Sequence, residues 1–360
     1  MAHPAITQQI AFWQNRRVFL TGHTGFVGSW LSLWLTRLGA QVTGYALAPH
    51  TTPSLYTQLG LEDRITSIIA DINDREALAT ALNTSNPSVV LHLAAQSLVG
   101  EAHLNPYACW QTNTLGTVAL LDAVKDLTSL ASTVLFTTDK VYQNAESGHA
   151  FTETDPVGGH GIYDSSKGGT ELAVHAFHQS GLLPGGMATI RAGNIIGGGD
   201  WNRDRLLPDI ARAFHQHQPV ILRQPGSIRP WQYVLDVCYA TLLLTEKLTK
   251  HPASYSGAWN IGPDANACLS ASTMAEHCAA IWGQQPAWQQ AEGAMRYPEA
   301  HTLVLNSDKL RQKLHWQPAL SISDAIAWTV AWYKATMETP DTVPAICQQQ
   351  FDDFMDRVTV

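Results

Sequence analysis

The chain has 360 residues, of which 45% are hydrophobic and 14% are charged, and its formal net charge is -8. This composition is typical of a globular protein with a large core, in two lobes, and excludes a disordered chain. The acidic balance offers no electrostatic basis for nucleic-acid binding. No window resembles a transmembrane span, no secretory signal is recognisable before Arg17, and the five scattered cysteines fit reduced thiols. We therefore expect a cytoplasmic protein that binds neither nucleic acid nor membrane.

The first half of the chain alternates short apolar runs with segments of helical periodicity. Strands are predicted at 17–21, 41–47, 67–70, 89–93 and 133–137, and helices at 26–38, 75–82 and 113–124. This alternation predicts an α/β fold with a doubly wound parallel sheet and right-handed crossovers, which is a Rossmann architecture.

The pattern loosens after Ile190. Loops at 197–200 and 225–230 flank a predicted helix at 206–215. We predict a dinucleotide-binding domain over 1–190, to which segments near 231–260 return. The smaller C-terminal lobe, 191–345, is expected mainly to bind substrate, and 346–360 is expected to form a C-terminal tail.

Three glycines lie between the first predicted strand and the first predicted helix. Glycine there permits a tight turn, lets backbone N–H groups approach a pyrophosphate, and lets the helix pack close to the sheet. The spacing alone is a weak signal, but its strand-turn-helix context predicts a dinucleotide site. The residues predicted to line this site are Gly22, Thr24, Gly25, Phe26, Val27 and Gly28.

The end of the second strand bears on the choice between NAD and NADP. An acidic residue about 20 positions after the turn normally binds the ribose hydroxyls. Here the segment 45–49 contains neither an acid nor an arginine that would suggest a 2′-phosphate, so NAD is favoured. Asp71 and Ile72, after the third strand, are candidates for contact with the adenine. The alternative for Asp71 is a capping role at the end of a strand.

Tyr163 and Lys167 are spaced so that both side chains lie on one face of a helix, one turn apart. A tyrosine titrates at about pH 10 unless assisted, and a nearby ammonium group and the charge of a nicotinamide lower its pKa. Tyr163 can then take a proton from a hydroxyl, and Lys167 can also hold the nicotinamide ribose. A surface pair on a helix is the alternative, but the preceding strand-helix units favour catalysis.

Thr138, Asp139 and Lys140 end the fifth strand, and the carboxyl ends of strands face the ligand crevice in a doubly wound sheet. Thr138 can bond the hydroxyl being oxidised, Asp139 can give a proton to a leaving group, and Lys140 can act as a base if burial lowers its pKa. The alternative is an ordinary turn after a strand. Simple alcohol oxidation does not need this second acid and base, so we predict an enzyme that removes a hydride, does further chemistry and returns the hydride.

Other catalytic patterns are not found in the sequence. His215 and His217 lack the spacing of metal ligands, so no metal site is predicted. Neither a Walker A pattern nor a G-x-S-x-G elbow occurs.

From about Phe12 to Lys334 the chain resembles the extended short-chain dehydrogenase/reductases of the NAD-dependent epimerase/dehydratase family. Within that family it is similar to the nucleotide-sugar 4,6-dehydratases that act on CDP-glucose. The motifs that carry the resemblance are Thr21–Phe26, His92–Gln96, Thr138–Lys140, Arg191–Asn194, Gly197–Trp201 and Ile228–Gln232. Lysine at position 140 is informative, because related dehydratases for other nucleotide sugars usually carry glutamate there.

The resemblance implies a reaction that uses NAD and yields a 4-keto-6-deoxy sugar nucleotide. Tyr163 takes the C4 hydroxyl proton as the C4 hydride leaves, Lys140 removes the C5 hydrogen, and Asp139 protonates the C6 hydroxyl, which departs as water. The hydride then returns to C6. An alkyl hydroxyl is a poor leaving group and needs both the adjacent carbonyl and an acid. The implied cofactor contacts also include Leu93, Ala94, Ala95, Tyr163 and Lys167, and the implied sugar-nucleotide contacts are Gln96, Asn194, Trp201, Arg205 and Arg229.

The sequence departs from the family pattern around the predicted site, although the five catalytic candidates survive. Val27 and Gly100 stand where basic residues are common, which removes two cations from the ligand region and can mean a different substrate. The other departures are Ala48 for an aspartate, Val141 for a cysteine, and Gly161 and Asp164 for an aspartate and a serine.

Competing functions remain open from the sequence. A 4-epimerase would need Tyr163 and Lys167 but not the Asp139–Lys140 pair, and a dehydratase for a different nucleotide sugar is a further alternative within the same superfamily. A non-catalytic NAD-binding scaffold would need neither pair. A homodimer is expected, because family members commonly pair through the helix that starts near Tyr163, which here carries Leu172, Val174, Ala176 and Phe177.

Overall fold

A parallel sheet of seven strands forms the centre of the computed structural model, which describes residues 4–292, 300 and 302–358. The strand order is β12-β7-β5-β4-β1-β2-β3, and every pairing is parallel. The strands are β1 (Arg17–Thr21), β2 (Gln41–Ala46), β3 (Thr66–Ile69), β4 (Val89–His92), β5 (Ser132–Phe136), β7 (Gly186–Ala192) and β12 (Gly257–Ile261). The strand order reverses between β1 and β4, which places a ligand crevice at their carboxyl ends. The predicted doubly wound Rossmann sheet is confirmed.

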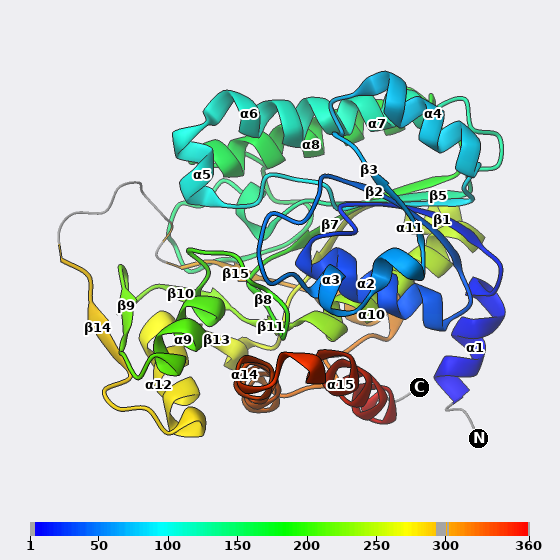
Figure 1. Ribbon diagram of the computed structural model, residues 1–360. Helices are drawn as coiled ribbons and strands as arrows, with labels where there is room; N and C mark the ends of the chain where they lie inside the picture. The colour runs from blue at the N-terminus through cyan, green and yellow to red at the C-terminus, as the bar shows by residue number, and fades with distance from the viewer. Residues whose placement is uncertain (1–3, 293–299, 301, 359–360) are drawn as a thin grey trace.

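Helices cover both faces of this sheet (Figure 1). One face carries α4 (Arg75–Ser85), α7 (Gly116–Val124) and α8 (Ile162–Gln179), and the other carries α2 (Phe26–Arg37) and α10 (Val234–Lys250). Successive strand residues therefore enter different cores: Val18 and Leu20 pack on the side of α2, and Phe19 packs on the side of α4. Burial on both faces explains why these strands read as nearly continuous apolar runs.

Short elements form a smaller lobe beyond the carboxyl ends of the strands (Figure 1). Two-stranded pairs connect β8 (Ile195–Ile196) with β11 (Gln232–Tyr233), β10 (Ile228–Pro230) with β13 (Cys268–Ser270), β9 (Val220–Leu222) with β14 (Trp288–Gln290), and β6 (Ala150–Phe151) with β15 (Val304–Leu305). The helices of this lobe are α9 (Leu206–His215) and α12 (Ala271–Trp282). The predicted helix at 206–215 is thus present at those bounds.

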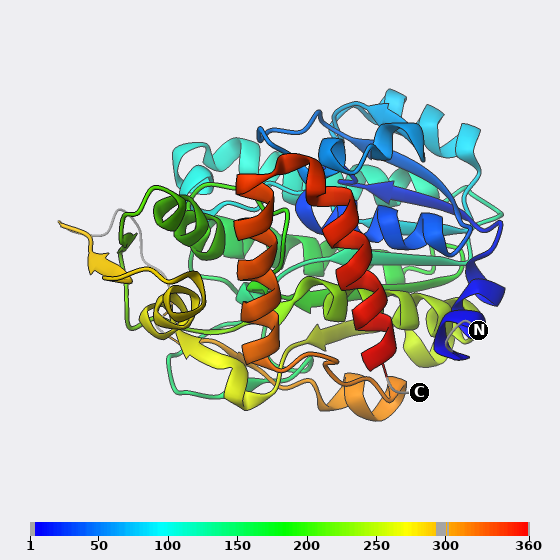
Figure 2. The same ribbon diagram turned by 60° about the horizontal axis from the view of Figure 1, so that its bottom comes forward.

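The C-terminal segment folds back over the sheet domain. After α13 (Asp308–Leu314), α14 (Ile322–Glu338) and α15 (Val343–Arg357) run side by side in opposite directions (Figure 2). Trp34 of α2 packs edge-on against Phe351 and Phe354, so α15 covers α2. Most of the segment predicted as a tail lies in this helix, and the division of the chain into domains stays a prediction.

The remaining helical segments complete the described chain. They are α1 (Pro4–Trp13), α3 (Leu55–Gln58), η1 (Leu61–Asp63), α5 (Val99–Leu104), α6 (Pro106–Trp110), η2 (Gln111–Leu115), η3 (Asp139–Val141), α11 (Pro252–Tyr255), η4 (Ala265–Ala267) and η5 (Pro340–Thr342). The helix predicted at 113–124 begins inside η2, which is a π-helical turn, and continues as α7. Across the described ranges, no helix is both long enough and apolar enough to cross a bilayer.

Candidate active site

A single turn after β5 holds the predicted acid and base in contact. Thr138 caps η3, and its hydroxyl donates to Asp139 Oδ1 at 2.9 Å. Lys140 Nζ lies 3.1 Å from the same oxygen. The Asp139 side chain is completely buried, whereas 23% of the Lys140 side chain is exposed. The carboxyl group is therefore out of contact with solvent, and the amine reaches the surface of the site.

The loop after β7 closes around the other side of Asp139. Asn194 Nδ2 donates to Asp139 Oδ2 at 3.0 Å, and Gly193 approaches the carboxyl group with its backbone. Gln232 of β11 supports this loop, because its Nε2 donates to the Gly193 carbonyl at 2.9 Å. Asn194, predicted to contact the sugar nucleotide, thus contacts the predicted acid.

Tyr163 enters the same cluster from the first turn of α8. Its side chain is 8% exposed, and burial raises the pKa of its phenol to about 12. The charge of Arg205 and a hydrogen bond with Thr138 lower this pKa, and the charge of Asp139 raises it. The phenol is therefore protonated at neutral pH in the absence of further positive charge.

Gly161 and Asp164, at which the sequence departs from the family pattern, are hydrogen-bonded to each other at the start of α8. The N–H of Gly161 donates to Asp164 Oδ2 at 3.1 Å, so the carboxylate at the third helical position caps the helix. A Cβ at Gly161 would lie 3.0 Å from that oxygen, which favours glycine there. The pair orients the helix turn that carries Tyr163.

Lys167 lies deeper than Tyr163 on the same helix. Its Nζ donates to the carbonyl of Phe136 at 2.9 Å, at the end of β5, and burial lowers its pKa to about 8. The charge of Arg205 lowers the pKa of the Tyr163 phenol. Arg205 precedes α9, donates to Ser97 Oγ at 3.1 Å, and lies 3.7 Å from Asp200 Oδ2.

The glycine turn has the shape that a pyrophosphate site needs. Gly22 has a φ of +75°, and a Cβ on Gly28 would lie 2.1 Å from the Gly22 carbonyl oxygen, so neither position accepts a side chain. Gly25 precedes α2 without a side-chain cap, which leaves the start of this helix to a ligand. Thr24 stabilises the turn, because its Oγ1 donates to the Leu47 carbonyl at 2.9 Å. These residues fit the pyrophosphate of NAD.

Other predicted cofactor residues make local hydrogen bonds or pack in the core. The N–H groups of Leu93 and Ala94 donate to Thr21 Oγ1 at 3.1 and 3.0 Å, which fixes the strand end beside Gly22. Asp71 Oδ1 accepts from the N–H of Asn73 at 2.9 Å in a local turn, and its contact with the adenine stays a prediction. Ile72 is 5% exposed and packs in the core, so its side chain does not face solvent.

Asn113 was not predicted as a site residue, although its hydrogen bonds connect Gln96 with α8. Its Oδ1 accepts from the N–H of Gln96 at 2.8 Å, and its Nδ2 donates to the Gln96 carbonyl at 3.0 Å and to Ser166 Oγ at 2.9 Å. It lies in the π-helical turn η2, and such turns are frequent at functional sites. A polar residue buried inside an apolar helix was the signal that could have revealed it.

Two further predicted substrate residues, Trp201 and Arg229, make contacts within the smaller lobe and its surroundings. Trp201 Nε1 donates to Gln58 Oε1 at 3.2 Å, and its ring packs on Trp332. Arg229 lies on β10, where its Nη1 donates to the Ile228 carbonyl at 2.9 Å. The roles of Trp201 and Arg229 in binding the sugar nucleotide stay predictions. In the part of the chain that the structure describes, no three His, Cys, Asp or Glu side chains gather as metal ligands.

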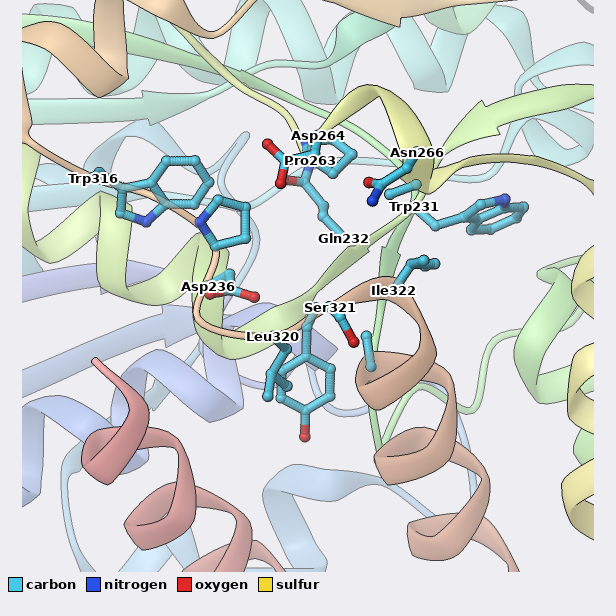
Figure 3. Close-up of a pocket in the computed structure, with 14 residues that line it drawn as sticks. Trp231, Gln232, Asp236, Pro263, Asp264, Asn266, Trp316, Leu320, Ser321 and Ile322 are labelled. Atoms are coloured by element: carbon cyan, nitrogen blue, oxygen red, sulfur yellow. The ribbon is translucent and has the colours of Figure 1, made fainter. Parts of the chain in front are cut away.

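A cavity of about 260 Å³ is lined by Gln232, whose Nε2 also donates to the Gly193 carbonyl (Figure 3). Trp231, Asp236, Asp264 and Trp316 line it together with residues that precede α14. It contains none of the predicted catalytic or cofactor residues.

Comparison with known proteins places this geometry in a family. The model of the GDP-mannose 4,6 dehydratase family matches residues 19–329. Over 356 residues, which are 97% of this chain and 98% of the relative, the sequence is 40% identical to the CDP-glucose 4,6-dehydratase of Salmonella typhimurium.

Solved structures share the fold. An epimerase from Methanothermobacter thermautotrophicus gives a TM-score of 0.81 at 21% identity, over 93% of this chain and 98% of that chain. The dTDP-glucose 4,6-dehydratase of Bacillus anthracis, solved in complex with NAD, gives a TM-score of 0.77 at 21% identity, over 90% of this chain and 98% of that chain. At this identity the likeness shows the fold alone. The family match and the 40% identity go further: the chain belongs to the GDP-mannose 4,6 dehydratase family, within the extended short-chain dehydrogenase/reductases.

Proposed function

We propose that this protein is a nucleotide-sugar 4,6-dehydratase that converts CDP-glucose to CDP-4-keto-6-deoxyglucose with NAD. The observation that carries the proposal is the contact of Lys140 Nζ with Asp139 Oδ1 at 3.1 Å, next to Tyr163. This arrangement supplies one base for the oxidised hydroxyl and a separate acid and base for elimination. The 40% identity to the CDP-glucose 4,6-dehydratase of Salmonella typhimurium supports CDP-glucose as the substrate.

Each side chain of the cluster has a defined task in this reaction. NAD, when bound at the glycine turn, would supply the oxidant that accepts the C4 hydride and later gives it back at C6. Tyr163 takes the proton of the C4 hydroxyl, and Arg205 lowers the pKa of the phenol for this step. Lys140 removes the C5 proton, which the new ketone makes acidic, and returns it after the hydride reaches C6. Asp139 protonates the C6 hydroxyl as water leaves.

Arg205 also supplies a positive charge near Gly100, which with Val27 stands where the family commonly carries a basic residue. Its guanidinium reaches Ser97 at 3.1 Å, in the loop that leads to Gly100, so it restores positive charge beside that position. Arginine pairs with phosphate through two parallel hydrogen bonds. The substitution of Gly100 for a basic residue is therefore compatible with a nucleotide diphosphate in this region.

The deciding experiment incubates the pure protein with NAD and CDP-glucose and analyses the sugar nucleotide by mass. Loss of one water without net change in the cofactor is the expected result. Asp139→Asn should abolish this loss, whereas Asp126→Asn, a matched change at an exposed position, should retain it.

The competing functions give different products in the same assay. A 4-epimerase would give a product of unchanged mass that keeps its C6 hydroxyl, also with Asp139→Asn. A dehydratase for another nucleotide sugar would leave CDP-glucose unchanged and dehydrate dTDP-, UDP- or GDP-sugars. A scaffold would bind NAD and convert none of them.

A homodimer and a cytoplasmic location belong to this proposal. Leu172 on α8 is 66% exposed and Leu115 on η2 is 58% exposed, which is typical of a surface that another copy covers. Val174 and Phe177 of the predicted interface instead pack inward, in the core between α8 and β5. Leu172→Glu should halve the mass measured by light scattering, and Ile221→Glu, an equally polar change at an exposed site on β9, should not.

A further inference from the structure

The carboxyl group of Glu171 lies at the centre of a buried cluster of polar side chains next to the candidate active site. Its Oε2 accepts from Arg191 Nη2 at 2.8 Å and from Thr189 Oγ1 at 3.0 Å. Its Oε1 accepts from Thr137 Oγ1 at 2.5 Å. Glu171 is 7% exposed and Arg191 is 5% exposed, so their ion pair is shielded from solvent. One carboxyl group therefore joins α8 to the end of β5 and to β7.

Two of the joined segments carry the predicted catalytic groups. Glu171 lies four residues after Lys167 and eight after Tyr163, so the three side chains lie on one face of α8. Thr137 directly precedes the turn 138–140, which holds the predicted acid and base. The hydrogen bond between Glu171 and Thr137 therefore connects the start of this turn to the helix face that carries the tyrosine and the lysine.

Arg191 extends the cluster to the other end of the same turn. Its Nη1 donates to the hydroxyl of Tyr142 at 3.0 Å, and Tyr142 follows the turn 138–140 by two residues. Arg191 also precedes the loop from which Asn194 donates to Asp139 at 3.0 Å. The turn is thus held on both sides by side chains that bond to one buried ion pair.

Stability alone does not explain a buried ion pair at this place. The attraction of two buried charges is largely offset by the cost of removing them from water, so apolar side chains of similar volume often stabilise a fold equally well. Hydrogen bonds between an arginine and a carboxylate have a defined direction and fix the groups that they join. A catalytic group that moves by about 1 Å loses about a hundredfold in rate. A directional contact beside the turn therefore serves catalysis more than stability.

We propose that Glu171 and Arg191 are positioning residues, whose ion pair holds the turn 138–140 against the face of α8 that carries Tyr163. The two residues act through the side chains that flank the turn and not on the substrate. This inference rests on the proposed 4,6-dehydratase function, because that reaction needs the turn and the helix to act on one sugar.

Two threonines that donate to the same carboxyl group provide a matched pair of variants. Thr137→Val and Thr189→Val each remove one hydroxyl that donates to Glu171, and valine keeps the shape of the side chain. Only Thr137 adjoins the turn 138–140, whereas Thr189 lies inside β7. The Thr137 hydroxyl also lies 3.1 Å from the Ile190 carbonyl, which keeps the N–H of residue 137 as a donor at 2.8 Å.

The two variants should separate positioning from stability. Thr137→Val should lower kcat for water loss from CDP-glucose by about tenfold or more and leave KM nearly unchanged, because the turn shifts and the binding groups do not. Thr189→Val should leave kcat nearly unchanged. Thr137→Ser, which restores the hydroxyl, should recover most of the lost rate. Urea unfolding of all three variants would show that Thr137→Val and Thr189→Val lose similar amounts of stability.

Tyr142→Phe tests the other side of the turn and serves if Thr137→Val does not fold. It removes the hydroxyl that accepts from Arg191 and donates to Asn260 Oδ1 at 2.5 Å. This variant should also lower kcat and leave KM nearly unchanged. Near-ultraviolet circular dichroism would show which variants are folded.

Hydrogen exchange gives a readout that does not depend on turnover. Amide exchange of the segment 137–142, followed by mass spectrometry, should be faster in Thr137→Val than in the wild type. It should be unchanged in Thr189→Val, which leaves the contact beside the turn in place.

Other outcomes overturn the inference. If both valine variants lower kcat equally, or neither lowers it, the cluster contributes only to the stability of the fold. Unchanged exchange of the segment 137–142 in Thr137→Val has the same meaning. Failure of the wild-type protein to dehydrate CDP-glucose would instead contradict the proposed function, and the exchange comparison would still decide whether the cluster holds the turn.

Discussion

Gly193 lies so close to Asp139 that no other residue fits at this position. A Cβ at position 193 would lie 2.1 Å from Asp139 Cγ and 2.1 and 2.2 Å from its two carboxyl oxygens. The carboxyl group therefore rests directly on the backbone of the loop after β7. The adjacent Asn194 donates to the same carboxyl group at 3.0 Å, so this loop sets the position of the predicted acid.

Gly193→Ala should displace Asp139 and lower kcat by about a hundredfold, because small misplacements of a catalytic group are costly. The measurement is the rate of water loss from CDP-glucose, with unfolding by denaturant recorded in parallel. Gly158→Ala is the matched control, since its Cβ would lie 3.9 Å from the nearest side chain. Equal rates for Gly193→Ala and the wild type would show that Asp139 can move without loss of function.

Asn194→Ala should lower kcat by roughly 10- to 100-fold and leave KM nearly unchanged, because a hydrogen bond to a charged group contributes about 1.5–3 kcal/mol. The sequence placed Asn194 against the sugar nucleotide, and that role would instead raise KM. Steady-state kinetics with CDP-glucose distinguishes the two. Asn83→Ala, at an exposed position of α4, is the control.

The sheet could be predicted because buried parallel strands carry their signal locally, as apolar runs between turns. Strand β7 escaped recognition as a strand because it contains Thr189 and Arg191. Both are buried and bonded to Glu171 on α8, Arg191 Nη2 at 2.8 Å and Thr189 Oγ1 at 3.0 Å. The partner is remote in sequence, so only the folded chain shows why these polar residues belong in a core strand.

The candidate site, like the sheet, could be predicted only where its residues are close together in the sequence. Thr138, Asp139 and Lys140 are neighbours in sequence, and a strand end predicts where they face. The hydrogen bond from Asn194 to Asp139 and the effect of the Arg205 charge on the pKa of Tyr163 connect residues from different segments, and no local pattern encodes them. Sequence reasoning therefore predicted an acid and a base but not the contacts that hold and tune them.

Arg205→Gln should raise the pKa of the Tyr163 phenol, because Arg205 is the first of the groups that lower it. A base acts only when it is deprotonated, so the rise of kcat with pH should move to higher pH. The measurement is the pH profile of kcat together with ultraviolet titration of the phenol. Arg203→Gln, an exposed change in the same loop, should leave both unchanged. An unshifted profile in Arg205→Gln would assign the tuning of the phenol to other charges.

Asp236, in the cavity of Figure 3, should make the stability of the fold depend on pH. It is 2% exposed, and burial raises its pKa from 3.8 to about 7, although it accepts from the N–H of Ala319 at 2.6 Å. At pH values between 3.8 and about 7, Asp236 is protonated in the folded chain and ionised in the unfolded chain. The stabilisation is therefore complete below about pH 4 and is lost as pH rises toward 7, and it amounts to roughly 4 kcal/mol at most.

Asp236→Asn should remove this contribution, because the amide does not titrate and its oxygen still accepts from Ala319. The free energy of unfolding, measured with urea from pH 5 to 8, should fall with pH more steeply in the wild type than in the variant. Asp126→Asn, at an exposed carboxylate, should keep the wild-type slope. Parallel curves for the wild type and Asp236→Asn would mean that Asp236 is ionised throughout this range and that water or a bound cation in the cavity compensates its charge.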